Sequence, residues 1–142
     1  MKFENIHKII IDKGLKVTPQ RLVVLETLLE IKNHPTAEKV IDSIKKNHPN
    51  IAIGTIYKTL ETFVKNGIIK KVKTEKDIMR YDVETKSHHH LYCDECEYIE
   101  NYYDDELDKL LKKYFERKQI PEFSIKEINL QIVGSYNQHK QN

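Results

Sequence analysis

A stretch of nine residues, HHHLYCDEC at 88–96, contains three histidines and both cysteines of the chain. Imidazole nitrogens and thiolates bind transition metals readily, so this density of them indicates metal chemistry. If the stretch forms a strand, successive side chains point to opposite faces, so His88 and His90 share one face while His89 and Cys93 share the other. The alternation predicts two separate sites, one at the histidine pair and one at the C-x-x-C pair.

A His-x-His pair needs two or three further ligands to hold an ion. The sequence offers His34, in a loop before a predicted helix, and Asp82, at the end of a predicted strand. A metal bound by His34, Asp82, His88 and His90 would fasten the two halves of the chain and act as a switch. Each residue also has a plain structural interpretation, since His34 could cap a helix and Asp82 could pair with Arg80.

The second pair, Cys93 and Cys96, has a spacing that suggests metal or redox chemistry in a reducing compartment; a pair of plain thiols is the alternative.

The chain has 142 residues, 39% hydrophobic and 32% charged, as expected of a globular protein. It has no run of about 20 apolar residues, and its start lacks the apolar core of a signal peptide, so we expect a cytoplasmic location without a membrane partner.

Charge and periodicity divide the chain into two halves. Residues 1–83 carry 16 Lys and Arg against 10 Asp and Glu, a balance of +6, whereas residues 84–142 carry 8 against 12, a balance of −4. Successive short helices and a strand hairpin predict a winged helix-turn-helix in the first half. We therefore predict an α+β protein with a DNA-binding domain at 1–83, a hinge at 84–87, and an α/β dimerisation and metal-binding domain at 88–142.

The last helix of the first half, AIGTIYKTLETFVKNG, is the expected recognition helix. We expect Ile53 to point inward, and the outward face to carry four residues suited to DNA: Thr55, Tyr57, Lys58 and Thr59. Hydroxyl, aromatic and ammonium groups contact phosphates, base edges and thymine methyl groups. A further contact is expected from Arg21 near the start of the second helix. An ordinary solvated helix face is the alternative.

The second half is short for an independent core. Two strands, a helix from Asp104 to about Lys118 and a final strand over 123–134 are expected, with Leu107, Leu110, Leu111, Tyr114 and Phe115 on the buried face of the helix. About 55 residues make a thin core, so this half is expected to pair with a second copy of itself.

The motifs TPQR, HPTAE, GTIYKTL, NGII, RYD and HHHLYCDEC occur in an order that resembles the ferric uptake regulator superfamily of metal-dependent transcription factors over residues 10–134. The resemblance implies a homodimer that represses at AT-rich palindromic operators when Fe²⁺ or Mn²⁺ is bound. With Asp82 in its RYD motif, the chain is most similar to the peroxide-responsive branch of the superfamily. That similarity implies oxidation of a ligand histidine, His34 or His88. The alternative is a regulator that senses the level of iron, manganese or zinc without peroxide chemistry.

The chain departs from the family pattern at its remaining ligand positions. The fifth regulatory ligand, an acidic residue in the family, is Asn101 here, and a neutral amide is a poor ligand for a hard ion. Where relatives complete a structural zinc site with a second C-x-x-C, this chain has Tyr136 and His139, so the resemblance implies at most a zinc site of Cys93, Cys96 and His139. A third metal site of some relatives looks absent, because Ser87 and Ile128 occupy two of its positions.

Two other functions fit some of these residues. A metalloenzyme would use the histidines and Asp82 to hold a catalytic ion, but no nucleophile motif or phosphate loop accompanies them, so we expect no enzyme activity and no small-molecule substrate. An architectural DNA-binding protein would hold metal for structure alone. A DNA affinity that depends on divalent metal distinguishes the switch from both.

Overall fold

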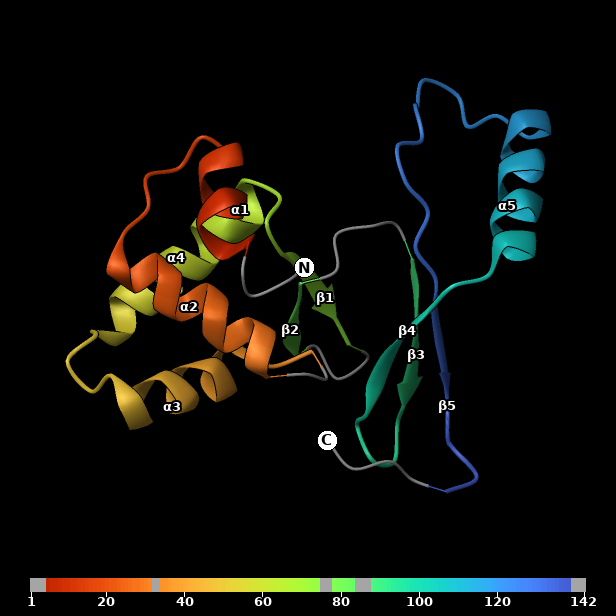
Figure 1. The fold of residues 1–142 in the computed structure, drawn as a ribbon. Helices are drawn as coiled ribbons and strands as arrows, with labels where there is room; N and C mark the ends of the chain where they lie inside the picture. The colour runs from red at the N-terminus through yellow and green to blue at the C-terminus, as the bar shows by residue number, and fades with distance from the viewer. Residues whose placement is uncertain (1–4, 32–33, 75–77, 84–87, 139–142) are drawn as a thin grey trace. The chain divides into compact units, whose positions relative to one another are not determined.

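The computed structural model describes residues 5–31, 34–74, 78–83 and 88–138. The chain divides into two compact units, Met1–Thr85, which contains α1 to α4 and a sheet, and Lys86–Asn142, which contains α5 and a second sheet (Figure 1). The predicted hinge at 84–87 lies outside the described residues. No helix in the described part of the chain is long and apolar enough to cross a membrane.

Four helices build most of the first unit: α1 (Ile6–Asp12), α2 (Pro19–Glu30), α3 (Ala37–Asn47) and α4 (Ile53–Lys65). Two of them begin after threonine caps: Thr18 Oγ1 accepts the backbone N–H of Arg21, and Thr36 Oγ1 accepts that of Lys39. These bonds satisfy amides that have no partner within the helix. In contrast, the residue before α4 is Ala52, whose side chain cannot form a capping hydrogen bond.

The core of the first unit consists of the apolar stripes that the helical periodicity predicts. Helix α2 packs against both α3 and α4, and Leu25, Ile44, Leu60 and Phe63 are buried between the helices. The backbone leaves α4 at Gly67, whose φ of +74° lies in the left-handed region that favours glycine. The chain then turns directly into the first strand.

The predicted hairpin forms a two-stranded antiparallel sheet, the wing, from β1 (Lys70–Lys73) and β2 (Met79–Asp82). Residues 75–77, between the two strands, lie outside the described residues. Strand β2 is also tied to the loop before α3, because the Tyr81 N–H donates to the Pro35 carbonyl at 2.9 Å. This contact brings the end of the wing beside the loop that carries His34.

The second unit contains a three-stranded sheet with the order β4–β3–β5, formed by β3 (His89–Cys93), β4 (Ile99–Tyr102) and β5 (Gln131–Gly134) (Figure 1). Strand β3 pairs antiparallel with β4 and parallel with β5. The last strand is shorter than predicted, since only the end of the 123–134 segment pairs with β3. The α+β class is confirmed.

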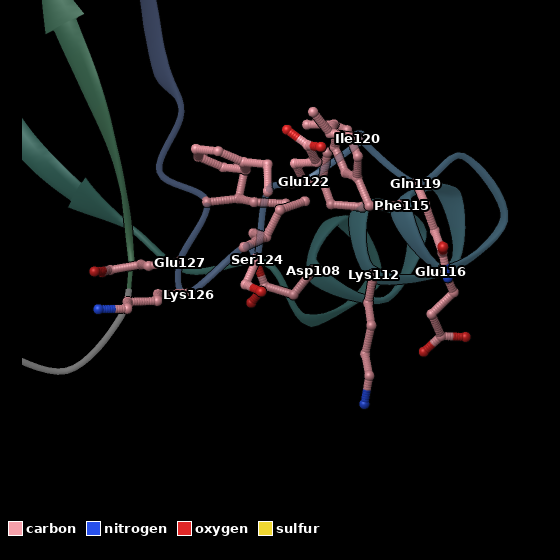
Figure 2. A pocket seen from close by; sticks show the side chains of 14 residues that line it. Asp108, Lys112, Phe115, Glu116, Gln119, Ile120, Glu122, Ser124, Lys126 and Glu127 are labelled. Carbon is pink, nitrogen blue, oxygen red and sulfur yellow. The ribbon is translucent and has the colours of Figure 1, made fainter.

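Helix α5 (Asp105–Arg117) begins at Asp104, whose Oδ1 accepts the Leu107 N–H at 3.1 Å. The prediction that five apolar residues form its buried face is wrong for the single chain, because no residue of α5 is buried and Leu110 is 67% exposed. An open groove of about 920 Å³ runs between α5 and the segment after it, lined in part by Phe115, Ile120 and Phe123 (Figure 2). An uncovered apolar surface of this kind is typical of an interface.

Candidate metal ligands and nucleic-acid interface

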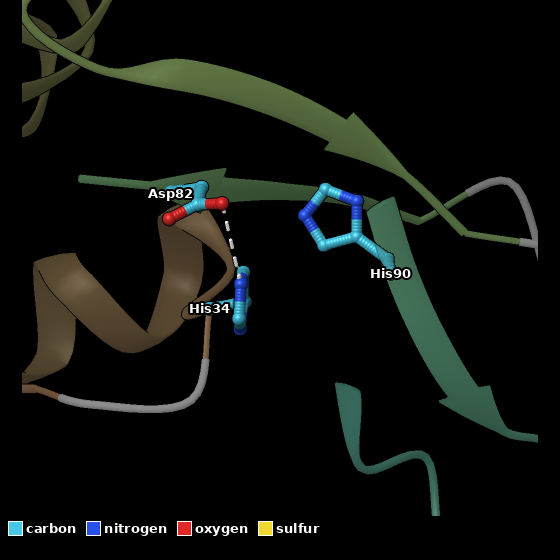
Figure 3. A group of neighbouring side chains, drawn as sticks. All are labelled: His34, Asp82 and His90. Atoms are coloured by element: carbon cyan, nitrogen blue, oxygen red, sulfur yellow. Dashed lines mark ion pairs between the residues drawn. The ribbon is translucent and has the colours of Figure 1, made fainter. Parts of the chain in front are cut away.

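In the first unit, the loop before α3 and the end of β2 bring one imidazole and one carboxylate together. His34 Nε2 lies 3.4 Å from Asp82 Oδ2; Asp82 is buried and His34 is half-buried (Figure 3). His34 has φ of +55°, a left-handed conformation that costs a non-glycine residue energy and is common at functional sites. Arg80, itself buried, holds this conformation, because its Nη1 donates to the His34 carbonyl at 3.2 Å.

In the second unit, the predicted alternation along the histidine run is realised. His88 and His90 point to one face of the sheet, and their Nε2 atoms lie 3.1 Å apart. Both imidazoles are buried. Two imidazole nitrogens this close together could ligate one ion, and the imidazole of His34 and the carboxylate of Asp82 could do the same in the first unit.

His89 has a different role, which the sequence did not indicate. Its side chain is 2% exposed on the opposite face of β3. Nδ1 accepts the backbone N–H of Leu130 at 3.0 Å, so Nε2 carries the proton and donates to Asp108 Oδ1 at 2.6 Å. His89 thereby connects the ligand strand to α5 and to the chain entering β5. It is a structural histidine between two candidate ligands.

Asn101 lies on the same sheet face as the histidine pair. It is the cross-strand partner of His90 on β4 and is half-buried. Directly paired residues in an antiparallel sheet have Cβ atoms about 5 Å apart. The register therefore places a neutral amide, rather than a carboxylate, beside the candidate ligands.

The cysteines occupy the tight turn that connects β3 and β4. Cys93 is buried, Cys96 is half-buried, and the Cys96 N–H points to Cys93 Sγ at 3.4 Å. Tyr136, at one of the expected C-terminal ligand positions, donates instead to Glu100 Oε1 at 2.5 Å. Burial, assisted by this bond, raises the pKa of the Tyr136 phenol. His139 lies outside the described residues, so the described part of the chain supplies only two of the four ligands that a structural zinc ion needs.

Helix α4 presents a different face from the one predicted. The expectation that Thr59 points outward is wrong, because it is 6% exposed and its hydroxyl donates to the Thr55 carbonyl at 2.8 Å. The inward placement of Ile53 is also wrong, since it is 51% exposed. Tyr57 and Lys58 are exposed as predicted, and Thr55 is half-buried.

The other predicted DNA contact, Arg21, lies on α2, and an ion pair joins α4 to the wing. Arg21 is half-buried, and its Nη1 donates to the Lys16 carbonyl at 2.7 Å. Glu61 of α4 forms an ion pair with Lys71 of β1 at 2.8 Å, and their hydrogen bond raises the pKa of Lys71. The ion pair connects the exposed face of α4 to the wing, so the two elements present one surface.

Comparison with known proteins agrees with the motifs. Residues 12–133 match the ferric uptake regulator family. The chain is 28% identical over 123 residues to the peroxide-responsive repressor PerR of Staphylococcus saprophyticus, a match that covers 87% of this chain and 81% of that protein.

Two solved structures have the same fold. The ferric uptake regulator of Vibrio cholerae is 25% identical with a TM-score of 0.74, covering 92% of this chain and 98% of that one. The ferric uptake regulator of Francisella tularensis, solved with iron, is 25% identical with a TM-score of 0.75, covering 87% and 93%. The resemblance drawn from the ordered motifs is confirmed.

Proposed function

The chain belongs to the ferric uptake regulator family, and we propose that it is a metal-dependent, DNA-binding repressor that works as a homodimer. The observation that carries this proposal is the presence of one prepared ligand pair in each unit. His34 and Asp82 lie together in the first unit, and His88 and His90 lie together in the second. Folding has twice brought buried or half-buried metal-binding groups together, which a purely structural role for each residue does not require.

We assign these four residues to one regulatory site for Fe²⁺ or Mn²⁺. Imidazole and carboxylate ligands without thiolate suit these ions. Arg80 supports the site by fixing the backbone of His34, and His89 supports it by fixing the strand that carries the histidine pair. Such supporting contacts orient ligands and contribute to metal affinity.

The proposed switch follows from the origin of the ligands in two units. Ligation by residues of both units restricts their relative placement, and DNA binding selects among such placements. The Vibrio cholerae relative is described as revealing a structural rearrangement of its DNA-binding domains, which supports a switch of this kind. A repressor that works in this way needs no catalytic residue and no small-molecule substrate.

We assign DNA binding to the first unit, which has a balance of +6 over residues 1–83. In a winged helix-turn-helix, one helix enters the major groove while neighbouring elements contact phosphates. The exposed Tyr57 and Lys58 are the proposed contacts on α4, with Thr55 at the edge and Arg21 toward the backbone. Thr59 is removed from the set because it is buried.

We assign dimerisation to the second unit. Its apolar side chains are exposed on α5, on the following segment and on β5: Leu110, Tyr114, Ile120, Phe123, Ile125 and Ile132. Burying such a surface against a second copy gives the favourable free energy that a unit of this size lacks by itself. The groove beside α5 is part of the same surface.

We propose peroxide as the signal, supported by the similarity to PerR of Staphylococcus saprophyticus. Redox-active iron, when bound, supplies the chemistry by which peroxide adds an oxygen to a nearby ligand, with His34 and His88 as the candidates. The register of Asn101 opposite His90 favours the alternative, a gauge of iron, manganese or zinc level. One fewer carboxylate weakens ion binding and makes Fe²⁺ less easily oxidised.

Mass spectrometry of the full chain separates the two signals. The Fe²⁺-loaded protein is treated briefly with stoichiometric peroxide, and its DNA binding is measured in parallel. Peroxide sensing predicts one added oxygen on His34 or His88 together with loss of DNA binding. The buried His89 is the internal control and should stay unmodified, as should all three residues in Mn²⁺-loaded protein. Retained DNA binding with intact histidines would instead establish the metal gauge.

Zinc at the cysteine turn stays a prediction. Cys93 and Cys96 are close enough for their backbone and sulfur atoms to interact, but Tyr136 is engaged with Glu100. A zinc ion there would need His139 and one more ligand. The stoichiometry of zinc in the purified protein decides this point independently of the regulatory site.

A further inference from the structure

The exposed face of α4 is more apolar than a solvated helix face needs to be. Residues Ile53, Gly54, Tyr57, Lys58 and Glu61 are exposed along it. Ile53 is 51% exposed and Tyr57 is 44% exposed. Neither side chain belongs to the core of the first unit. Folding therefore does not account for an isoleucine in the first turn of this helix.

These residues form one continuous surface. Ile53 and Tyr57 are separated by four positions, which places their side chains next to each other on the helix. Gly54 lies beside Ile53, and a side chain added there would meet no atom within 4 Å. The first turn of α4 is thus an apolar pair next to bare backbone, accessible to a ligand that can approach closely.

The surroundings of this surface point to DNA as the occupant. Lys58 follows Tyr57 directly, and residues 1–83 carry an excess of six positive charges. The winged-helix arrangement directs the first residues of the recognition helix toward base edges. In the major groove, the one apolar group on any base pair is the C5-methyl group of thymine.

We propose that Ile53 contacts thymine methyl groups and, with Tyr57, determines the operator sequence that the protein prefers. This inference rests on the proposed function of α4 as the DNA-binding helix, and it deepens that function by naming what the helix reads. Lys58 supplies affinity for the backbone regardless of sequence, whereas Ile53 distinguishes thymine from the other bases.

The test uses the full-length, metal-loaded protein and a duplex that it selects from a random library. Single thymines in each half-site are replaced by deoxyuridine, which lacks the methyl group and keeps the same hydrogen-bonding pattern. Burial of one methyl corresponds to a factor of about four in affinity, so a symmetric replacement should weaken wild-type binding by about 16-fold. At the contacted positions, Ile53→Ala should show no such loss.

Two matched variants control for other effects. Ile11→Ala changes an isoleucine that is 59% exposed on α1, and it should respond to deoxyuridine as the wild type does. Lys58→Ala should weaken binding to selected and random duplexes alike and keep the response to deoxyuridine. Ile53→Leu keeps the apolar side chain and should retain most of the response, which provides a second measurement if the alanine variant folds poorly.

The possible failures are distinguishable. If the protein selects a duplex but Ile53→Ala and the wild type respond equally to every replacement, Ile53 does not read thymine. The same conclusion follows if no replacement affects the wild type. If the metal-loaded protein selects no duplex at all, the proposed function itself is wrong, and the inference fails with it.

Discussion

Leu110 offers a quantitative test of the dimer surface. It is 67% exposed in the single chain, on the middle of α5. Full burial of a leucine contributes about 2 kcal/mol relative to exposure, so burying the remaining two-thirds against a partner contributes about 1.4 kcal/mol per protomer. A symmetric dimer contains the contact twice. Leu110→Ala should therefore weaken dimerisation by about 3 kcal/mol, which corresponds to about 100-fold in the dissociation constant.

Sedimentation equilibrium over a range of protein concentrations measures this constant. Ile11→Ala is the matched control, because Ile11 is similarly exposed but lies on α1 of the first unit. It should leave the dissociation constant unchanged. If Leu110→Ala dimerises within about twofold of the wild type, the apolar face of α5 is not the interface, and its exposure needs another explanation.

Three further outcomes are expected. Lys58→Ala removes one phosphate contact per protomer, so the slope of log affinity against log salt, measured by DNA titration, should become shallower by about 1.8 per dimer; an unchanged slope would exclude Lys58 as a phosphate contact. Burial, assisted by the bond to Glu100, raises the pKa of Tyr136, so the neutral phenol stabilises the fold fully below about pH 10 and progressively less above it. Urea unfolding should show that Tyr136→Phe is less stable than the wild type at pH 8, with the gap narrowing toward pH 11; a constant gap would refute this linkage. If the cysteine turn holds zinc, Cys93→Ser should contain one zinc fewer per chain than the wild type in metal analysis after removal of the regulatory metal; equal zinc contents would exclude the site.

Features that depend on local chemistry were predictable from the sequence. Thr18 and Thr36 mark helix starts because a side-chain oxygen at that position satisfies a free amide of the next turn. The separation of His88 and His90 from His89 follows from the period of two along a strand. These inferences needed no knowledge of distant residues.

Features that depend on tertiary placement were not predictable. Thr59 fits the buried stripe of α4 by position, three residues after Ile56 and four before Phe63, but its hydroxyl suggested a solvent-facing residue. Ile53 fits an inward position by type, but the first turn of the helix extends beyond the core. The left-handed backbone of His34 depends on a bond from Arg80, which is far away in the sequence.

The expected burial of α5 failed for a different reason. The apolar spacing on that helix is real, but the described residues of the second unit leave no residue of the helix buried. Periodicity shows that a face prefers an apolar environment and does not show whether the same chain provides that environment. A partner surface and a core face therefore give the same sequence pattern.

If metal bound by both units controls DNA binding, DNA affinity must change when divalent metal is removed. The selected duplex is titrated with wild-type protein in Mn²⁺ and again in chelator, and with His90→Ala in the same two conditions. We expect tight binding by the wild type in Mn²⁺, at least 10-fold weaker binding in chelator, and weak binding by His90→Ala in both. Wild-type binding that is equally tight in metal and in chelator would contradict it.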